Sequence, residues 1–296
     1  MIRKTKCGVS TPESLSSRAV LVHLNQHYWF GKISDLKITD EVNKKYSADG
    51  SYEKRLIPAK EMKEMGSAFT VVRNIHNRYT LPWSGDGWHI LASAAYYQWD
   101  KELREAIAVA EQKADAFAQK WEDLVNQMAK TDKSFDPDHY PSKKVIRAKY
   151  GFDIHYKPVP VGGDVRISIS NDALAAIQAN VNNDQQQYVE TMMLDIAERI
   201  KDVVGKLVTK LREYKPAKKD KKAENSFKDS LVENVRDLAG LLPKLNPGGV
   251  IKIDQMAAEL LKILPASADT LRDDDKVRQQ TADAAEKILS HVGDFV

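Results

Sequence analysis

The sequence predicts a mainly α-helical protein with a small β element, on three observations. Residues 92–130 and 171–214 each carry apolar side chains in steps of three and four, which places them on one face of a helix. Between these segments, residues 152–157 and 165–169 alternate apolar and polar side chains, as β-strands do. We therefore expect a long antiparallel helical hairpin that carries a β-hairpin, followed by a C-terminal helical bundle.

Composition divides this chain into four parts. Residues 1–16 are rich in Ser, Thr, Lys and Pro and are expected to form a flexible N-terminal tail. Residues 17–214 form the predicted helical core, with the β-hairpin at about 152–170. A lysine-rich linker is expected at 215–225, and a C-terminal helical bundle at 226–296.

The first elements of the core are short. We expect a strand at 19–24, a helix at 40–46 and a longer helix at 58–78, where the fixed φ of Pro58 suits the first helical position. Residues 81–88 contain one proline and two glycines, so they are predicted to be a loop.

The predicted β-hairpin consists of two alternating segments joined by a turn at 158–163. Because two strands alone are marginally stable, we expect the hairpin to pack on other structure, for example the strand at 19–24. The apolar residues of its two strands are Phe152, Ile154 and Tyr156 in the first, and Val165, Ile167 and Ile169 in the second.

The segment 171–214 is the most informative of the chain. As a helix it would be roughly 66 Å long, so its apolar stripe needs an equally long partner, for which the helix at 92–130 is available. Ser170 or Asn171 is expected to cap it, and its acidic residues gather near the start and its basic residues near the end, which complements the helix dipole. The stripe is interrupted at Gln185, which indicates either a hydrated stretch where the partner ends or a polar pin of coiled-coil register. After Pro216 and the linker, we expect helices at 227–244, 253–264 and 275–292.

The composition limits the classes of function that the protein can have. With 42% hydrophobic and 29% charged residues, the 296-residue chain has the composition of a folded protein, and its net charge of +3 does not by itself predict nucleic-acid binding. No apolar run is long enough for a membrane span, and the basic start is followed by no apolar region, so we expect no secretory signal. Cys7 is the single cysteine. We expect a cytoplasmic protein without a membrane partner.

Common catalytic signatures are missing from the sequence. It contains no phosphate-binding P-loop, no His-Glu-x-x-His and no Gly-x-Ser-x-Gly. We therefore predict no catalytic residues, no cofactor and no metal site.

Residues 73–99 are the richest polar and aromatic stretch. They are interpreted either as a loop that aromatic side chains hold on the core, or as a nucleic-acid surface, or as an acid–base or metal site made of His76, Asp86 and His89. The linker lysines are likewise either a solvated tether or a track for a phosphate backbone. The residues of the nucleic-acid alternative are Arg73, Arg78, Trp83, Trp88, Lys215, Lys218, Lys219, Lys221 and Lys222.

Several strings resemble the DUF3150 family, a family of unknown function. The resemblance extends over about residues 17–292, and its most specific strings are Leu-Pro-Trp at 81–83 with Gly-Asp-Gly at 85–87, and Phe-Lys-Asp-Ser-Leu-Val-Glu-Asn at 227–234. It implies a protein of bacteriophages or mobile elements, encoded near a MoxR-like AAA+ ATPase and working inside the bacterial host cell. No catalytic residues come with this resemblance.

The function expected from these observations is that of a non-enzymatic accessory protein. It would be a helical scaffold or adaptor that self-associates as a homo-oligomer and works with a MoxR-like AAA+ ATPase. The alternative is a protein that binds DNA or RNA through phosphate contacts and aromatic stacking.

Overall fold

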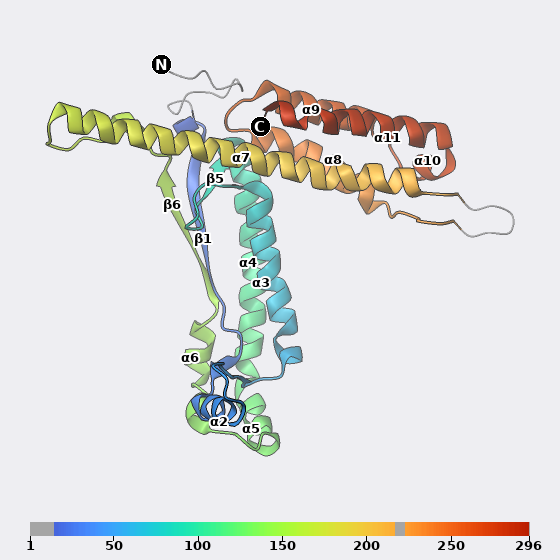
Figure 1. Cartoon of the computed structure of the whole chain (residues 1–296). Helices are drawn as coiled ribbons and strands as arrows, with labels where there is room; N and C mark the ends of the chain where they lie inside the picture. The colour runs from blue at the N-terminus through green and yellow to red at the C-terminus, as the bar shows by residue number, and fades with distance from the viewer. Residues whose placement is uncertain (1–14, 217–222, 296) are drawn as a thin grey trace. The chain divides into compact units, whose positions relative to one another are not determined.

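A computed structural model of the chain describes residues 15–216 and 223–295 (Figure 1). Its described part contains ten α-helices, one four-stranded sheet and one two-stranded sheet, so the predicted mainly α fold with a small β element is confirmed. The residues group into two compact units. Unit 1 contains the chain up to His23, Tyr79–Tyr97 and Tyr156–Val296, and unit 2 contains Leu24–Arg78 and Gln98–His155.

The four-stranded sheet has the order β4-β5-β1-β6. Its strands are β1 (Ala19–His27), β4 (Leu81–Pro82), β5 (His89–Ala92) and β6 (Gly151–Pro158). Strand β5 lies antiparallel to β1 with Val20 opposite Leu91, and β4 pairs with the other edge of β5. The side chains of Leu21, Val22, Ile90 and Leu91 are at most 1% exposed, so this pairing lies in the hydrophobic core of unit 1.

The predicted β-hairpin at 152–170 is wrong in its second strand. Strand β6 pairs with β1, while the chain after it forms the short helix η2 (Gly162–Asp164) and then an irregular segment up to Ser170. Ile167 and Ile169 are 50% and 42% exposed. The nine-residue edge of β1 gives β6 a longer partner within a larger sheet, and such a sheet is more stable than an isolated hairpin.

The long helix is confirmed as α7 (Asn171–Glu213), and Ser170 caps it by accepting a hydrogen bond from the backbone N–H of Ala173. Its second half packs against α11 (Asp275–Ser290) and α8 (Ser230–Leu241) within unit 1. The buried residues of this face are Met192, Met193, Ile196, Ala197, Ile200, Val204, Leu207 and Leu211.

The predicted antiparallel pair of 92–130 with 171–214 is wrong, because each stripe has other partners. The first segment forms α4 (Ser93–Gln119) and α5 (Trp121–Thr131), with a break at Lys120. From Gln98 onward these helices belong to unit 2, where α4 lies beside α3 (Ala59–Tyr79) and Lys113 Nζ is 2.9 Å from Glu64 Oε2. The C-terminal helices cover the second half of α7 instead.

The helices predicted after the linker are present in unit 1. The chain continues from α8 through η3 (Leu242–Leu245), α9 (Ile251–Ile263) and α10 (Ala268–Asp273) to α11 and η4 (Val292–Phe295). Because α8 and α11 pack on α7, the domain boundary expected at 215–225 falls inside unit 1. Lys215 and Glu224 bracket that segment with two backbone hydrogen bonds of 3.1 Å.

Unit 2 has an aromatic core. Its further elements are β2 (Lys32–Ser34), α2 (Leu36–Tyr46), β3 (Glu53–Arg55), η1 (Pro137–His139) and α6 (Lys143–Ala148), and β2 pairs with β3. Tyr28, Phe69 and Tyr150 meet edge to face with ring centroids 5.1–6.1 Å apart. The predicted flexible tail lies outside the described residues up to position 14, and Leu15 is buried.

Candidate functional site

The loop between β4 and β5 is held on the core of unit 1. Trp83 is only 3% exposed, its ring lies 4.9 Å from that of Tyr188 on α7, and its backbone N–H donates to the carbonyl of Trp88 at 2.9 Å. A buried indole is not available to stack on a nucleic-acid base. Burial of Trp83 supports the interpretation that aromatic residues hold this loop in place.

Trp88 is half-buried and already has cationic and aromatic neighbours. Lys157 Nζ lies 3.9 Å from the centre of its ring, and the ring of His23 lies 5.4 Å away. A lysine this close gains a cation–π attraction. Gly87, with a φ of +85°, lets the loop turn beside His23.

His89 belongs to a polar network under the same loop. Its Nδ1 is 2.8 Å from Thr80 Oγ1, and Arg199 of α7 donates to the Thr80 carbonyl at 2.8 Å and pairs with Asp195 at 2.6 Å. Burial, together with the nearby Arg199 and His23, lowers the pKa of His89, which keeps its imidazole neutral at pH 7. The network therefore fastens the loop to α7.

The three candidate residues of an acid–base or metal site do not form a cluster. His76 is buried in unit 2 beside Trp99, while Asp86 and His89 belong to unit 1. Asp86 accepts a hydrogen bond from Ser84, which lowers the pKa of its carboxyl. Within 15–216 and 223–295, no three His, Cys, Asp or Glu side chains gather as ligands for a metal ion.

The charged residues of the predicted nucleic-acid surface are distributed over both units. Arg73 and Arg78 lie on α3, and Arg78 Nη1 is 4.0 Å from Glu102 Oε2. Lys215 pairs with Glu224 at 2.9 Å. Lys218, Lys219, Lys221 and Lys222 lie outside the described residues. Of the predicted set, Trp83 is buried and so does not belong to an exposed surface.

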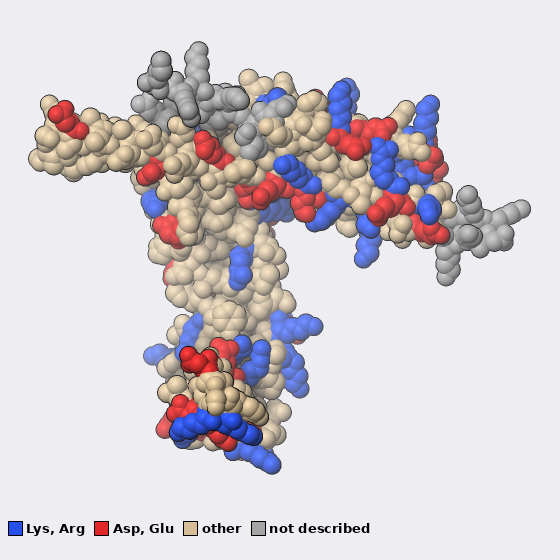
Figure 2. Space-filling view, viewed as in Figure 1, with Lys and Arg blue, Asp and Glu red and all other residues tan. Residues whose placement is uncertain are grey.

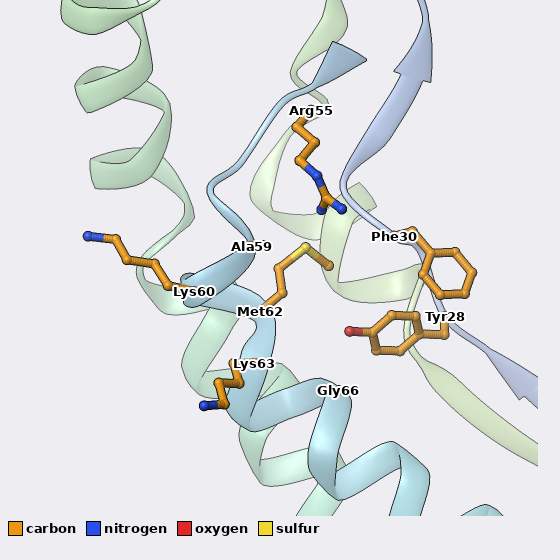
Figure 3. A pocket seen from close by; sticks show the side chains of 8 residues that line it. All are labelled: Tyr28, Phe30, Arg55, Ala59, Lys60, Met62, Lys63 and Gly66. Atoms are coloured by element: carbon orange, nitrogen blue, oxygen red, sulfur yellow. The ribbon is translucent and has the colours of Figure 1, made fainter. Parts of the chain in front are cut away.

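A hollow in unit 2 combines aromatic and cationic side chains that the sequence-based site did not include (Figure 3). It measures about 410 Å³ and lies where β1, β3 and the start of α3 meet. Its lining residues are Tyr28, Phe30, Arg55, Ala59, Lys60, Met62, Lys63 and Gly66. The Tyr-Trp-Phe run at 28–30, which stands directly before Gly31, is the sequence feature that could have indicated it.

A second surface feature is the start of α7, which has few charges. Arg166, Asp172 and Asp184 are the only charged residues from 165 to 187, although 29% of the chain is charged. Figure 2 shows this end of α7 almost entirely without Lys, Arg, Asp or Glu. Ile177 of α7 is 36% exposed, and it follows the exposed Ile167 and Ile169.

Comparison of the chain with protein-family models, with curated proteins and with solved structures finds no match. In the described part of the chain, no helix combines the length and the apolar character that crossing a membrane requires.

Proposed function

We propose that the protein is a non-enzymatic scaffold or adaptor that self-associates through the first half of α7. The observation that carries this proposal is the weakly charged, isoleucine-bearing surface formed by the exposed residues of 165–187, named here the α7 entry surface. Exposed large apolar side chains that lie together are typical of interaction sites.

The α7 entry surface has a defined structure. The chain before α7 runs along its first turns, because Gln178 Nε2 donates to the Val165 carbonyl at 3.4 Å and Asn182 Oδ1 accepts from the Gly162 N–H at 3.2 Å. These contacts place the segment with Ile167 and Ile169 next to the helix that carries Ile177. The surface therefore includes two strips of chain.

A second copy of this chain is the partner that this surface fits best. In a two-fold dimer the same patch meets itself, so a strongly charged patch would repel its copy. The α7 entry surface has one basic and two acidic residues, and its other polar groups are amides and hydroxyls that both donate and accept hydrogen bonds. Such a surface is complementary to itself.

The resemblance to the DUF3150 family extends the proposal to a partner. Proteins of that family are encoded near a MoxR-like AAA+ ATPase, which suggests a phage or mobile-element process in a bacterial cell. This part of the proposal rests on the resemblance alone. In this view the self-associated chain presents repeated copies of a docking surface to the ATPase.

The self-association is tested by light scattering coupled to size-exclusion chromatography. Wild-type protein is expected to elute as a dimer or larger, and the double variant Ile169→Glu/Ile177→Glu as a monomer, because carboxylates would be buried at the interface. Ile251→Glu is the matched control, since Ile251 is 72% exposed on α9 and lies outside the α7 entry surface. A wild-type monomer at tens of micromolar would overturn the proposal.

The partner is tested by the same light-scattering measurement after a MoxR-like AAA+ ATPase and ATP have been added. Wild-type protein and the ATPase are expected to elute together in one peak. This peak should be smaller for the double variant if the ATPase needs several linked copies of the chain in order to bind. Separate elution of the two proteins under all nucleotide conditions would remove the ATPase from the proposal and leave self-association to its own test.

A further inference from the structure

We propose that the hollow in unit 2 binds a single strand of nucleic acid, with one base against Phe30 and the phosphates along Arg55, Lys60 and Lys63. This inference goes beyond the scaffold function and uses other residues. It differs also from the surface predicted from residues 73–99, whose Trp83 is buried.

Phe30 has the features of a stacking platform. Its side chain is 67% exposed, although burying a ring of this size would be favourable. The ring of Tyr28 meets it edge to face at 5.0 Å, and Tyr28 is itself held by Phe69 at 5.1 Å. Phe30 is thus supported from the core of unit 2 while it remains open to solvent. Exposed aromatic rings of this kind stack on any base.

The backbone after Phe30 brings the first cation to the ring. Gly31 has a φ of +67°, a left-handed conformation that favours glycine, and a Cβ there would lie 2.6 Å from Met62 Sδ. The Gly31 carbonyl accepts a hydrogen bond from the Leu56 N–H at 2.9 Å, which holds the end of β3 next to this turn. Arg55 therefore projects into the hollow close to Phe30, as Figure 3 shows.

The positively charged side chains that line the hollow can bind an anion. No lining residue is acidic, and neither Arg55 nor Lys63 forms an ion pair with a carboxylate among the residues that the structure describes. Lys60 has only a contact of 3.7 Å with its neighbour Glu61. Glu53 interacts electrostatically with Arg55 but is itself paired with Lys32 at 2.8 Å, so the three cations of the hollow keep a net positive field that attracts phosphates.

The spread of these cations favours a strand over a mononucleotide. Figure 3 shows Arg55 on the side of Phe30, whereas Lys60 and Lys63 leave α3 on the other side of Met62. Cations placed on two sides of Met62 suit several phosphates better than one. Successive phosphates of a strand can meet these groups while the base of one nucleotide lies on Phe30.

The proposal is tested by fluorescence anisotropy with a labelled oligothymidylate of about 12 nucleotides, a length that covers one such site. Wild-type protein is expected to bind it with an affinity that falls as salt rises. Phe30→Ala is expected to weaken binding about tenfold or more, because a stacked base is lost, and Phe30→Trp to retain it. Arg55→Gln and Lys63→Gln are each expected to lower the slope of log affinity against log salt by about 0.7.

Matched controls separate the hollow from general effects of charge and aromatic content. Lys144→Gln removes the same charge from α6 of unit 2, and Tyr97→Ala removes an aromatic side chain that is 84% exposed elsewhere. Both should bind as wild type does. Circular dichroism melts of every variant verify the fold, and the exposure of Phe30 makes unfolding of Phe30→Ala unexpected.

Four results would overturn the proposal. They are no binding by wild type at low salt, an equal loss in Phe30→Ala and Tyr97→Ala, competition by thymidine monophosphate as strong as by the oligonucleotide, and competition by polyglutamate as strong as by the oligonucleotide. The last result would show an acidic-peptide site that does not use the ring. Self-association is measured separately, so failure here leaves the scaffold proposal standing.

Discussion

Gln185 is the most unusual side chain of α7, because it is buried without hydrogen bonds. It is 2% exposed, and neither its amide oxygen nor its amide nitrogen has a partner. A buried amide in this state destabilises a fold by about 1–3 kcal/mol. The amides beside it, Asn182, Asn183 and Gln186, are exposed, as expected of a hydrated stretch, so Gln185 is the exception within that stretch.

Replacing Gln185 by methionine should therefore stabilise the protein. Methionine has a similar shape and flexibility and no amide to desolvate, so Gln185→Met is expected to raise the free energy of unfolding by about 1 kcal/mol. Urea denaturation followed by circular dichroism measures the change. Gln186→Met at the exposed neighbouring position should have almost no effect. A destabilised Gln185→Met protein would indicate that the amide has a bonding role.

At the scale of single elements, η2 and α7 are joined by a close backbone approach. A Cβ on Gly162 would lie 2.6 Å from the Gln178 carbonyl oxygen and 2.6 Å from Asn182 Oδ1, whereas a Cβ on Gly163 would meet nothing within 4 Å. The two adjacent glycines thus have different surroundings. Only the first one needs to lack a side chain.

This difference predicts opposite outcomes for two similar substitutions. Gly162→Ala should push η2 away from α7 and lower the free energy of unfolding by about 1–3 kcal/mol, as overpacking does. Gly163→Ala should be neutral within about 0.5 kcal/mol, as for an exposed position. Chemical denaturation of both variants gives the comparison, and equal effects would contradict the close approach.

The sequence predicts single elements well and their partners poorly. Helix α7 could be predicted because its stripe, its Ser170 cap and its charge order are all local. The helix that packs on this stripe could not be predicted, because α4 and α11 both have apolar faces. Only the long-range packing in the tertiary structure shows that the partner is α11. The alternation at 165–169 likewise predicted a strand, but no sheet edge is paired with it.

The same limit applies to the candidate sites. The aromatic and basic residues of 73–99 were visible in the sequence, but their burial depends on contacts with Tyr188 and Arg199, about a hundred residues later. The hollow in unit 2 is lined by residues between 28 and 66. The sequence shows a phenylalanine at position 30 but does not show whether its side chain is exposed or buried. Side-chain exposure is a property of the tertiary structure.

For the whole molecule, the path of the chain between its two units has a consequence for stability. The chain passes between the units four times, and β1, α4 and β6 each contain residues of both. Unfolding of either unit therefore breaks elements that the other also uses. We expect one cooperative unfolding transition for the described chain.

A charge pair of unit 2 allows a test of this cooperativity. Lys54, whose side chain is 5% exposed, pairs with Asp132 at 2.9 Å and also donates to the Ser134 carbonyl. Asp132→Asn leaves the buried ammonium uncompensated and should lower the free energy of unfolding by about 3 kcal/mol.

Hydrogen exchange measured by mass spectrometry gives the outcome for each unit. In Asp132→Asn, amides of β5 in unit 1 and of α3 in unit 2 should lose protection together. Lys133→Gln, an adjacent exposed position, should leave both unchanged. Loss of protection confined to α3 would show that the units unfold independently.

The packing of α7 on α11 also has a consequence for synthesis on the ribosome. About 60 residues separate the end of α7 from the start of α11, and translation at roughly 5–20 residues per second needs several seconds to produce them. During this interval Ile200, Val204 and Leu207 of the nascent chain lack the cover that α11 later provides. A chaperone that binds apolar helices would meet the protein at this stage, before α11 exists.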